Sequence, residues 1–303
     1  MSRPVAAIDC GTNTIKLLVT GPDGELVREM RMVRLGEGVD RTGMLAPAAL
    51  ERTFAALDEY ADLLREHDVP ASRVRFCATS ASRDAGNADV FRAGVRARLG
   101  LDPEVVSGAE EAALAFGGSV RNLRVAPTHP VLVVDVGGGS TELVLGDDTG
   151  PGLAHSMDIG SVRLHERHLR SDPPTAAEVA AVLADVDRAL DACPVDPAVA
   201  ATVVGVAGTV TTLAAGVLGL VSYDRSAIDQ SVLGAHDVQA LVDRLVAMSV
   251  AERLALPWMH PGRADVIGAG ALILGRVLER SGAGQLVVSE SDILDGIAWS
   301  LLE

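Results

Sequence analysis

The sequence predicts an α/β protein made of two duplicated lobes with a central cleft. The first observation is a repeat, because residues 5–19 (VAAIDCGTNTIKLLV) and 131–145 (VLVVDVGGGSTELVL) share one pattern. Each copy has an apolar run, an aspartate, a turn of small residues and a second apolar run, which is typical of a β-hairpin. The second observation is that strands and then helices follow each copy. The third is length, because 303 residues suffice for two domains.

In the first half, apolar patterning and turn residues predict a regular order of elements. Strands are expected at 5–9, 14–19, 26–33, 74–78 and 105–106. Helices are expected from Pro47 to about His67, from a loop at 79–84 to Gly100, and from Ser107 to about Leu123. Two prolines in residues 124–130 (RVAPTHP) mark the expected boundary between a first lobe over 1–125 and a second over 126–289.

The second half repeats this order, beginning with the hairpin at 131–145. Strands are expected near 153–164, at 202–206 and at 285–289. Helices are expected at 176–192, from about 210, at 236–248, at 263–280 and at 292–302. Pro173 and Pro174 break the chain before the first of these helices.

Composition excludes several classes of protein. A chain that is 48% hydrophobic and 22% charged is globular rather than disordered. A net charge of −15 argues against nucleic acid or an anionic membrane as the main partner. The three cysteines have no metal-ligand spacing, no segment is apolar enough to cross a membrane, and Asp9 interrupts the short apolar run at the N-terminus. We therefore expect a cytoplasmic protein.

The turns of the two hairpins carry residues suited to holding phosphate. Phosphate oxygens need donors that approach closely, so small residues and bare backbone N–H groups suit them. Asp9 and Asp135, at the bases of the hairpins, are suited to hold a hydrated Mg²⁺ that neutralises the phosphate. The alternative is two ordinary tight turns, but the repetition favours function. The phosphate candidates in the turns are Gly11, Thr12, Asn13, Gly137, Gly138, Gly139, Ser140 and Thr141.

Glu111 is the candidate for activating water. Ser107 and Glu110 have the spacing of a capping box, which gives Glu110 a structural role at the start of a helix. Glu111 has no such role and lies in the first turn, where the helix dipole favours its ionised form. A carboxylate held there could order and deprotonate an attacking water. The alternative is an ordinary glutamate facing solvent.

Five further residues are candidate phosphate contacts. Gly208 and Thr209 belong to a strand–turn–helix segment, GVAGTVT, that could seat phosphate at a helix N-terminus, although glycines also serve close packing. Arg83 and Arg263 could hold phosphate oxygens with their planar guanidinium groups, although each could equally be a surface residue. Lys16 is the only lysine of the chain and lies just after the first turn. The alternative explanation for a lysine at this position is chance.

Nine segments in order resemble the exopolyphosphatase / guanosine pentaphosphate phosphohydrolase (Ppx/GppA) family. They cover the chain from about residue 5 to its end. The segments are IDCGTNTIKLLV, RLGEGVDRTGML, TSASRDAGN, SGAEEA, VVDVGGGSTELVLG, DIGSVRL, GVAGTVTTLA, RADVIGAGALIL and SESDILDGI.

The resemblance implies an actin-like, ribonuclease H-like fold of the acetate kinase, sugar kinase, Hsp70 and actin superfamily. It implies that a last helix, within 290–303, packs back on the first lobe. It places the catalytic base on Glu111, cleft carboxylates on Asp135 and Glu142, and phosphate contacts on Asn13, Arg83, Gly138, Ser140 and Arg263. Lys16 stands where many members have arginine, and the HD-like C-terminal extension of longer members is not expected.

From these observations we expect a Mg²⁺-dependent phosphohydrolase, with Mn²⁺ as an alternative metal, that releases terminal phosphate from short polyphosphate. Asp9, Asp135 and Glu142 are the expected metal ligands. Guanosine pentaphosphate is the alternative substrate. A kinase and a non-catalytic actin-like nucleotide switch are the rival functions. A homodimer is also expected.

Overall fold

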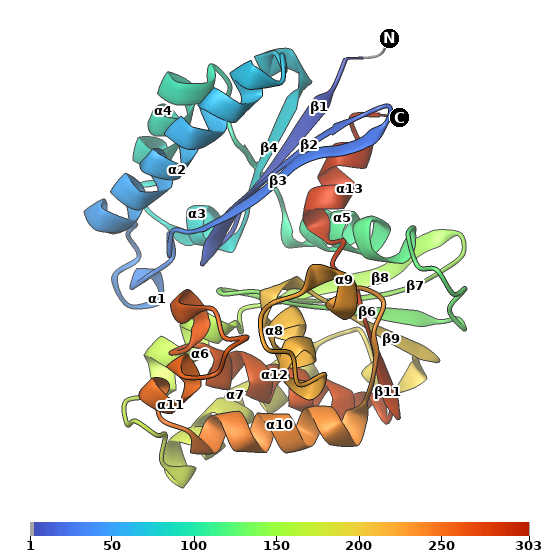
Figure 1. The fold of residues 1–303 in the computed structure, drawn as a ribbon. Coiled ribbons are helices and arrows are strands. Elements are labelled where there is room, and N and C mark those ends of the chain that lie inside the picture. Colours follow the sequence, from blue (N-terminus) through green and yellow to red (C-terminus); the bar gives the residue numbers. More distant parts are fainter. Residues whose placement is uncertain (1–2, 303) are drawn as a thin grey trace.

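The computed structural model describes residues 3–302 and contains two mixed β-sheets, one in each lobe, with helices on their faces (Figure 1). The first sheet has the strand order β3-β2-β1-β4-β5. Strands β1, β2 and β3 form an antiparallel meander, while β4 and β5 run parallel to β1. Its strands are β1 (Val5–Cys10), β2 (Thr14–Gly21), β3 (Gly24–Met32), β4 (Val74–Ala78) and β5 (Glu104–Val105).

The second sheet repeats this topology. Its order is β10-β11-β9-β6-β7-β8, so apart from the added edge strand β10 each strand has a counterpart in the first sheet. The registers also agree, because Asp9 lies opposite Lys16 and Asp135 lies opposite Glu142. Its strands are β6 (Val131–Val136), β7 (Thr141–Asp147), β8 (Gly150–Met157), β9 (Thr202–Val206), β10 (Val232–Gly234) and β11 (Gln285–Val288). The predicted fold class of two duplicated α/β lobes is confirmed.

The helices follow the strands in both halves. The first half contains α1 (Val39–Thr42), α2 (Pro47–Glu66), α3 (Ser80–Asp84), α4 (Ala88–Leu99) and α5 (Gly108–Val120). The second contains α6 (Ser161–His168), α7 (Ala176–Ala192), α8 (Ala207–Val217), α9 (Arg225–Ile228), α10 (Ala235–Ala247), α11 (Val250–Leu254), α12 (Ile267–Ser281) and α13 (Ile293–Trp299). Short 3₁₀ turns are η1 (Ala71–Arg73), η2 (Pro197–Val199) and η3 (Pro261–Arg263).

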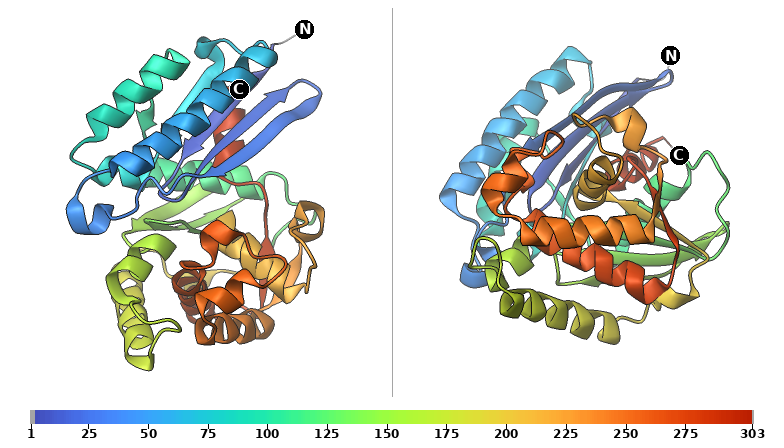
Figure 2. Two further views of the ribbon diagram at one scale, coloured as in Figure 1. Left: turned by 60° about the vertical axis from the view of Figure 1, so that its left-hand side comes forward. Right: turned by 60° about the horizontal axis from the view of Figure 1, so that its bottom comes forward.

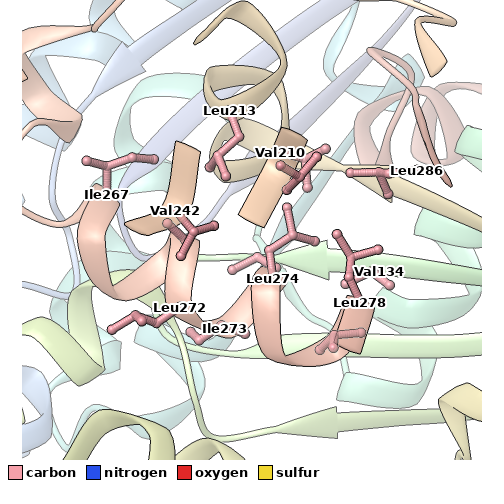
Figure 3. Close-up of a cluster of buried hydrophobic side chains, with 14 of the residues drawn as sticks. Val134, Val210, Leu213, Val242, Ile267, Leu272, Ile273, Leu274, Leu278 and Leu286 are labelled. Atoms are coloured by element: carbon pink, nitrogen blue, oxygen red, sulfur yellow. The ribbon is translucent and has the colours of Figure 1, made fainter. Parts of the chain in front are cut away.

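Each lobe has its own apolar core. Helices α2 and α4 lie together on one face of the first sheet, where Leu57, Phe76 and Phe91 are buried (Figure 2). In the second lobe, α8 and α12 pack against the sheet through residues such as Val210 and Leu274 (Figure 3). Burial of such side chains supplies most of the favourable free energy of folding.

Helices α5 and α13 cross between the two sheets. Helix α5 packs on β6, β7 and β8 of the second sheet, whereas α13 packs on β1 and β2 of the first (Figure 1). At the crossing their backbones touch: a Cβ on Gly118 would lie 1.9 Å from the Asp292 carbonyl oxygen, and a Cβ on Gly296 would lie 2.1 Å from that of Leu114. The lobe boundary at residues 125 and 126 stays a prediction, and α5, which precedes it in the chain, packs on the second sheet.

Some predicted elements are wrong. Residues 80–84 form helix α3 rather than a loop, because burial of Ala81 and Ser82 outweighs the loop preference of small polar residues. The strand expected to reach 164 ends at Met157, and helix α6 follows from Ser161. Helix α8 begins at Ala207 rather than near 210, and the short elements α1, α9, β10 and α11 were not expected. No helix among residues 3–302 has the length and apolarity needed to span a membrane.

The helix crossing yields a stability prediction. Gly118→Ala is expected to destabilise the protein by roughly 1–3 kcal/mol, because the new methyl group meets backbone of α13 that cannot move aside independently. The neighbouring Gly117→Ala is the control, since nothing lies within 4 Å of its Cβ position. That variant should gain about 0.5–1 kcal/mol from helix propensity. Urea denaturation of both variants tests this, and equal stability of the two would contradict the close crossing.

Candidate active site

The turns of the two repeat hairpins meet in one small polar pocket, here called the cleft pocket, of about 80 Å³. Residues of both lobes line it, with α5, α8 and the start of α13 completing its wall. Its lining is Asp9, Gly11, Thr12, Asn13, Thr14, Lys16, Thr79, Ser80, Glu111, Asp135, Val136, Gly137, Gly138, Gly139, Ser140, Glu142, Ser161, Ala207, Gly208, Thr209, Arg263 and Ile293.

Direct contacts hold the two turns together. The Thr12 and Ser80 hydroxyls are hydrogen-bonded to each other at 2.9 Å. Gly139 of the other lobe lies against both, because a Cβ atom added to it would be only 2.5 Å from each hydroxyl oxygen. Arg163 donates to the Gly139 carbonyl oxygen at 2.7 Å and to Asp40 of the first lobe at 2.8 Å. The lobes are therefore closed over the pocket on this side.

Four buried carboxylates face the pocket. Asp9 and Asp135 end the first strands of the two hairpins, Glu142 lies opposite Asp135, and Glu111 projects from the first turn of α5. Each has at most 8% of its surface exposed. Lys16, which corresponds to Glu142 in the repeat, places an ammonium group 3.7 Å from Asp9.

Burial dominates the protonation of this cluster. It raises the pKa of Asp9 to about 6, although the charge of Lys16 acts to lower it. Burial and then the neighbouring Glu142 raise the pKa values of Glu111 and Asp135 well above their usual range. Burial also raises the pKa of Glu142, against hydrogen bonds from Ser156 and Ser140. Carboxylates this crowded favour binding of a proton or a cation.

Two expectations about Glu111 need correction. Ser107 accepts the Glu110 N–H at 3.2 Å, but the Glu110 side chain pairs with Arg75 at 2.7 Å, so the capping box is only half formed. The helix dipole was expected to favour ionised Glu111, whereas burial beside Glu142 outweighs it and raises the pKa. Arg83 lies 3.4 Å from Glu111 and opposes this rise.

Arg263 enters the pocket across the N-terminus of α8. Its guanidinium lies on Gly208, where a Cβ would come within 1.3 Å of it, so a side chain there would displace the arginine. Ala207 begins the helix with φ at 65°, an uncommon conformation for alanine that is typical of functional sites. The backbone N–H of Arg263 donates to the His260 carbonyl oxygen, but among the side chains that the structure describes its guanidinium has no hydrogen bond or salt bridge, so it is available to an anion.

The cleft pocket gathers all the predicted site residues except Arg83 and Thr141. Arg83 reaches the site only through Glu111 and otherwise donates to the Val106 carbonyl. The Thr141 hydroxyl donates to the Ile159 carbonyl oxygen at 2.7 Å, and its contact with phosphate stays a prediction. The residues that sequence reasoning missed are Thr14, Thr79, Ser80, Val136, Ser161, Ala207 and Ile293. The Thr/Ser-rich segment before Arg83 is a sequence pattern that could have indicated Thr79 and Ser80 as site residues.

One polar atom in the pocket lacks a partner. The side-chain oxygen of Asn13 is buried and accepts no hydrogen bond from the described residues. A buried amide left unpaired is costly, so a ligand or water is the expected partner. Rotation of the amide group would present its NH₂ to a phosphate oxygen instead.

A second pocket, here called the side pocket, adjoins the first. It has a volume of about 450 Å³ and shares Lys16, Ala207, Gly208 and Arg263 with the cleft pocket. Its remaining lining is Arg28, Glu29, Met30, Thr211, Thr212, Tyr223, Arg225, Pro257, Trp258, Met259, His260, Pro261, Ser289, Glu290, Asp292 and Leu294. The size and the aromatic and thioether walls are those of a pocket for a small organic group.

The donor set of the cleft pocket fits a hard divalent cation. Its carboxylates have raised pKa values and few cations to balance them. Among residues 3–302, no three acidic, histidine or cysteine side chains converge to form a complete metal cage. Mg²⁺ commonly binds through one or two carboxylates, with water and substrate phosphate completing its shell. The residues therefore suit a metal that arrives with phosphate.

The two duplicated lobes meet at a pocket of small-residue turns, carboxylates and an arginine. This combination defines an enzyme that handles phosphoryl groups. Comparison with known proteins agrees, because the model of the Ppx/GppA phosphatase family matches residues 23–303. The chain belongs to this family, as the sequence motifs indicated.

Its relatives include proteins with two different names. Exopolyphosphatase 2 of Mycobacterium tuberculosis is 49% identical over 98% of both chains. The crystal structure of an exopolyphosphatase-like protein superposes with a TM-score of 0.93 at 42% identity, covering 98% of each chain. The guanosine-5'-triphosphate,3'-diphosphate pyrophosphatase of Aeromonas salmonicida is 29% identical over 98% of this chain, which spans 59% of that relative.

Proposed function

We propose that the protein is an exopolyphosphatase, a hydrolase that removes the terminal phosphate from short inorganic polyphosphate. The observation that carries the proposal is the cleft pocket, where Glu111 shares one small space with both phosphate-type turns and Arg263. The similarity to exopolyphosphatases along the whole chain supports the same reaction.

In this proposal Glu111 acts as general base. It orients a water molecule toward the terminal phosphorus and takes a proton as the new P–O bond forms. The bond from that phosphorus to the bridging oxygen breaks, and the remaining chain leaves as a shortened polyphosphate with its charge on that oxygen. A carboxylate with a raised pKa accepts a proton from water more readily than an ordinary carboxylate does, because its affinity for the proton is higher.

The other residues hold the transferred group. The turns at Gly11–Asn13 and Gly137–Ser140 would donate N–H and hydroxyl groups to the terminal phosphate, and Arg263 would balance charge near the leaving oxygen. Mg²⁺, or Mn²⁺ as the alternative, would bind through one or two of the predicted ligands Asp9, Asp135 and Glu142, with water and phosphate completing its shell, and the bound metal would offset the negative charge of the phosphates. The expected homodimer and the cytoplasmic location stay predictions.

Charge around the side pocket favours a short chain. Arg28 pairs with Asp295 at 2.5 Å and with Glu25 at 2.7 Å, and Arg225 pairs with Glu25 at 3.2 Å. These arginines are thus already neutralised, whereas a long polyanion needs a continuous run of available positive charge. Only the first few phosphates beyond the cleft pocket would find a free cation.

A second candidate substrate is guanosine pentaphosphate. The side pocket favours it, because Trp258 and Tyr223 offer aromatic surface next to the place where the phosphates would lie. A nucleoside could occupy this space while its terminal phosphate reached Glu111. The relative from Aeromonas carries a matching name.

Changing the base gives the sharpest activity prediction. Glu111→Gln is expected to lower kcat roughly 10²–10⁴-fold, because the amide keeps the shape but cannot accept the proton. Glu110→Gln is the matched control. Glu110 is the exposed neighbour of Glu111 and pairs with Arg75 outside the pocket, so this variant should retain activity. Phosphate release by Glu111→Gln at a rate near that of the unchanged protein would remove Glu111 from the role of base.

Metal removal tests the carboxylates. Chelation with EDTA should abolish phosphate release, and added Mg²⁺ should restore it. Asp135→Asn should raise the Mg²⁺ concentration needed for half-maximal activity about 10–100-fold, because one anionic ligand is lost. Full activity of the chelated protein would exclude the proposed metal role.

Substrate choice separates the two candidates. Values of kcat/KM should be compared for tripolyphosphate, for polyphosphate of several hundred units and for guanosine pentaphosphate. We expect the highest value for the short chain and a ladder of intermediate lengths from the long one, because few cations retain the product. Preference for the nucleotide would favour the second candidate. Higher efficiency on long chains without intermediates would contradict the inference from charge.

A further inference from the structure

The only lysine of the chain lies where the two pockets join, and its closest acidic partner comes from the far end of the sequence. Lys16 lines both the cleft pocket and the side pocket. Its ammonium donates to Asp292 at 2.5 Å, while Asp9 lies farther away at 3.7 Å. Both Lys16 and Asp292 are largely shielded from solvent, with side-chain exposures of 17% and 9%. A pair shielded in this way is screened little by salt.

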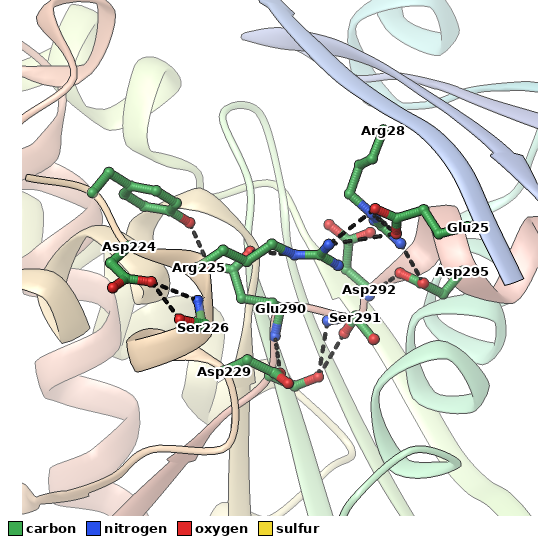
Figure 4. A network of polar contacts seen from close by, with 12 residues as sticks. Glu25, Arg28, Asp224, Arg225, Ser226, Asp229, Glu290, Ser291, Asp292 and Asp295 are labelled. Atoms are coloured by element: carbon green, nitrogen blue, oxygen red, sulfur yellow. Dashed lines mark hydrogen bonds and ion pairs between the residues drawn. The ribbon is translucent and has the colours of Figure 1, made fainter.

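The backbone around Asp292 is fixed from several sides. Asp292 is the N-cap of α13, where its second carboxylate oxygen accepts the Leu294 N–H at 2.9 Å and Asp295 accepts its own N–H at 3.0 Å. Its carbonyl oxygen touches Gly118 at the crossing with α5. Figure 4 shows Asp292 beside Asp295, which Arg28 holds on the first sheet.

This anchoring gives Lys16 a defined place. A lysine side chain has four rotatable bonds, so a charge at its tip is mobile unless a partner holds it. Without Asp292, the nearest carboxylate is Asp9, a proposed metal ligand in the cleft pocket. The ammonium would then turn inward, compete with the metal and leave the junction between the pockets.

We propose that Asp292 is a positioning residue that holds the Lys16 ammonium at the junction of the two pockets, where it contacts the phosphates next to the terminal one. The contact with phosphate rests on the proposed function, whereas the hold of Asp292 on Lys16 does not. Asp292 itself touches no substrate in this arrangement, so its effect on binding passes through Lys16.

The single lysine makes this testable by spectroscopy. In protein labelled with ¹³C-lysine, one side chain contributes one ε-methylene NMR signal. Titration with methylenediphosphonate, which has two linked phosphate-like groups and cannot be hydrolysed, should shift this signal saturably. In Asp292→Asn the signal of the free protein should move, and the shift caused by this phosphate analogue should fall at least about 5-fold, because the ammonium is no longer held. Asparagine keeps the helix cap, so the variant should fold.

Kinetics supply the second measurement. Asp292→Asn should raise KM for tripolyphosphate about 10-fold and change kcat by less than about 2-fold, the pattern of weakened binding remote from the reacting bond. Asp224→Asn is the matched control, because Asp224 is also an aspartate N-cap, of α9, but lines neither pocket. It should leave both KM and the lysine signal close to those of the unchanged protein.

A double-mutant cycle distinguishes positioning from a merely structural role. If Asp292 acts through Lys16, Asp292→Asn should add almost nothing to the KM of Lys16→Met. Full additivity, or a lysine signal that responds to methylenediphosphonate equally in Asp292→Asn and the unchanged protein, would overturn the inference. Failure of the proposed function would look different, since no phosphate would be released from polyphosphate, while the lysine signal would still show whether Asp292 holds Lys16.

Discussion

The close crossing of α5 and α13 is the constraint on which the arrangement of the site depends. Each helix lies between the two sheets, and the backbones meet at Gly118 and Gly296 without intervening side chains. Helix α5 carries Glu111 at its start, and α13 begins at Asp292. One contact therefore sets the distance between the proposed base and the residue that holds Lys16. Larger residues at the crossing would separate Glu111 from Asp292 and would move the two sheets apart at the same time.

The second determinant is an excess of buried negative charge. Asp9, Glu111, Asp135 and Glu142 share a space with only Lys16 and Arg263 as cationic neighbours lining it. Carboxylates arranged in this way cost stability in the free protein, because burial raises their pKa values and neighbours repel. Such a cost is typical of sites organised for a ligand rather than for stability. The carboxylate cluster also explains how a protein of net charge −15 could bind a polyanion, because a cation bound by these carboxylates would reverse the local potential.

Much of the fold and of the site could be predicted from the sequence, for a physical reason. The two hairpins keep the same spacing of aspartate, turn and return strand, so the pairing of Asp9 with Lys16 and of Asp135 with Glu142 follows from strand register alone. Contacts between distant segments could not be found in this way. The ion pair of Lys16 with Asp292 joins residues 276 positions apart, and the contact of Arg263 with Gly208 also depends on tertiary packing. Burial and the charge of Glu142, from the second sheet, raise the pKa of Glu111, and no local helix signal reveals either effect.

The arrangement of the two pockets separates the reaction from the choice of substrate. On one side, Arg163 and Arg167 pair with Asp40 and join the lobes beside the turns. The cleft pocket continues instead into the side pocket through Lys16 and Arg263. In the proposed function, whatever is attached to the terminal phosphate would extend into the side pocket. The cleft pocket would take the terminal phosphoanhydride, and the paired arginines and aromatic walls of the side pocket would decide whether a phosphate chain or a nucleoside follows it. Differences in substrate among proteins with the same cleft residues should thus arise from the side pocket, because only there does the chemistry of the leaving group differ.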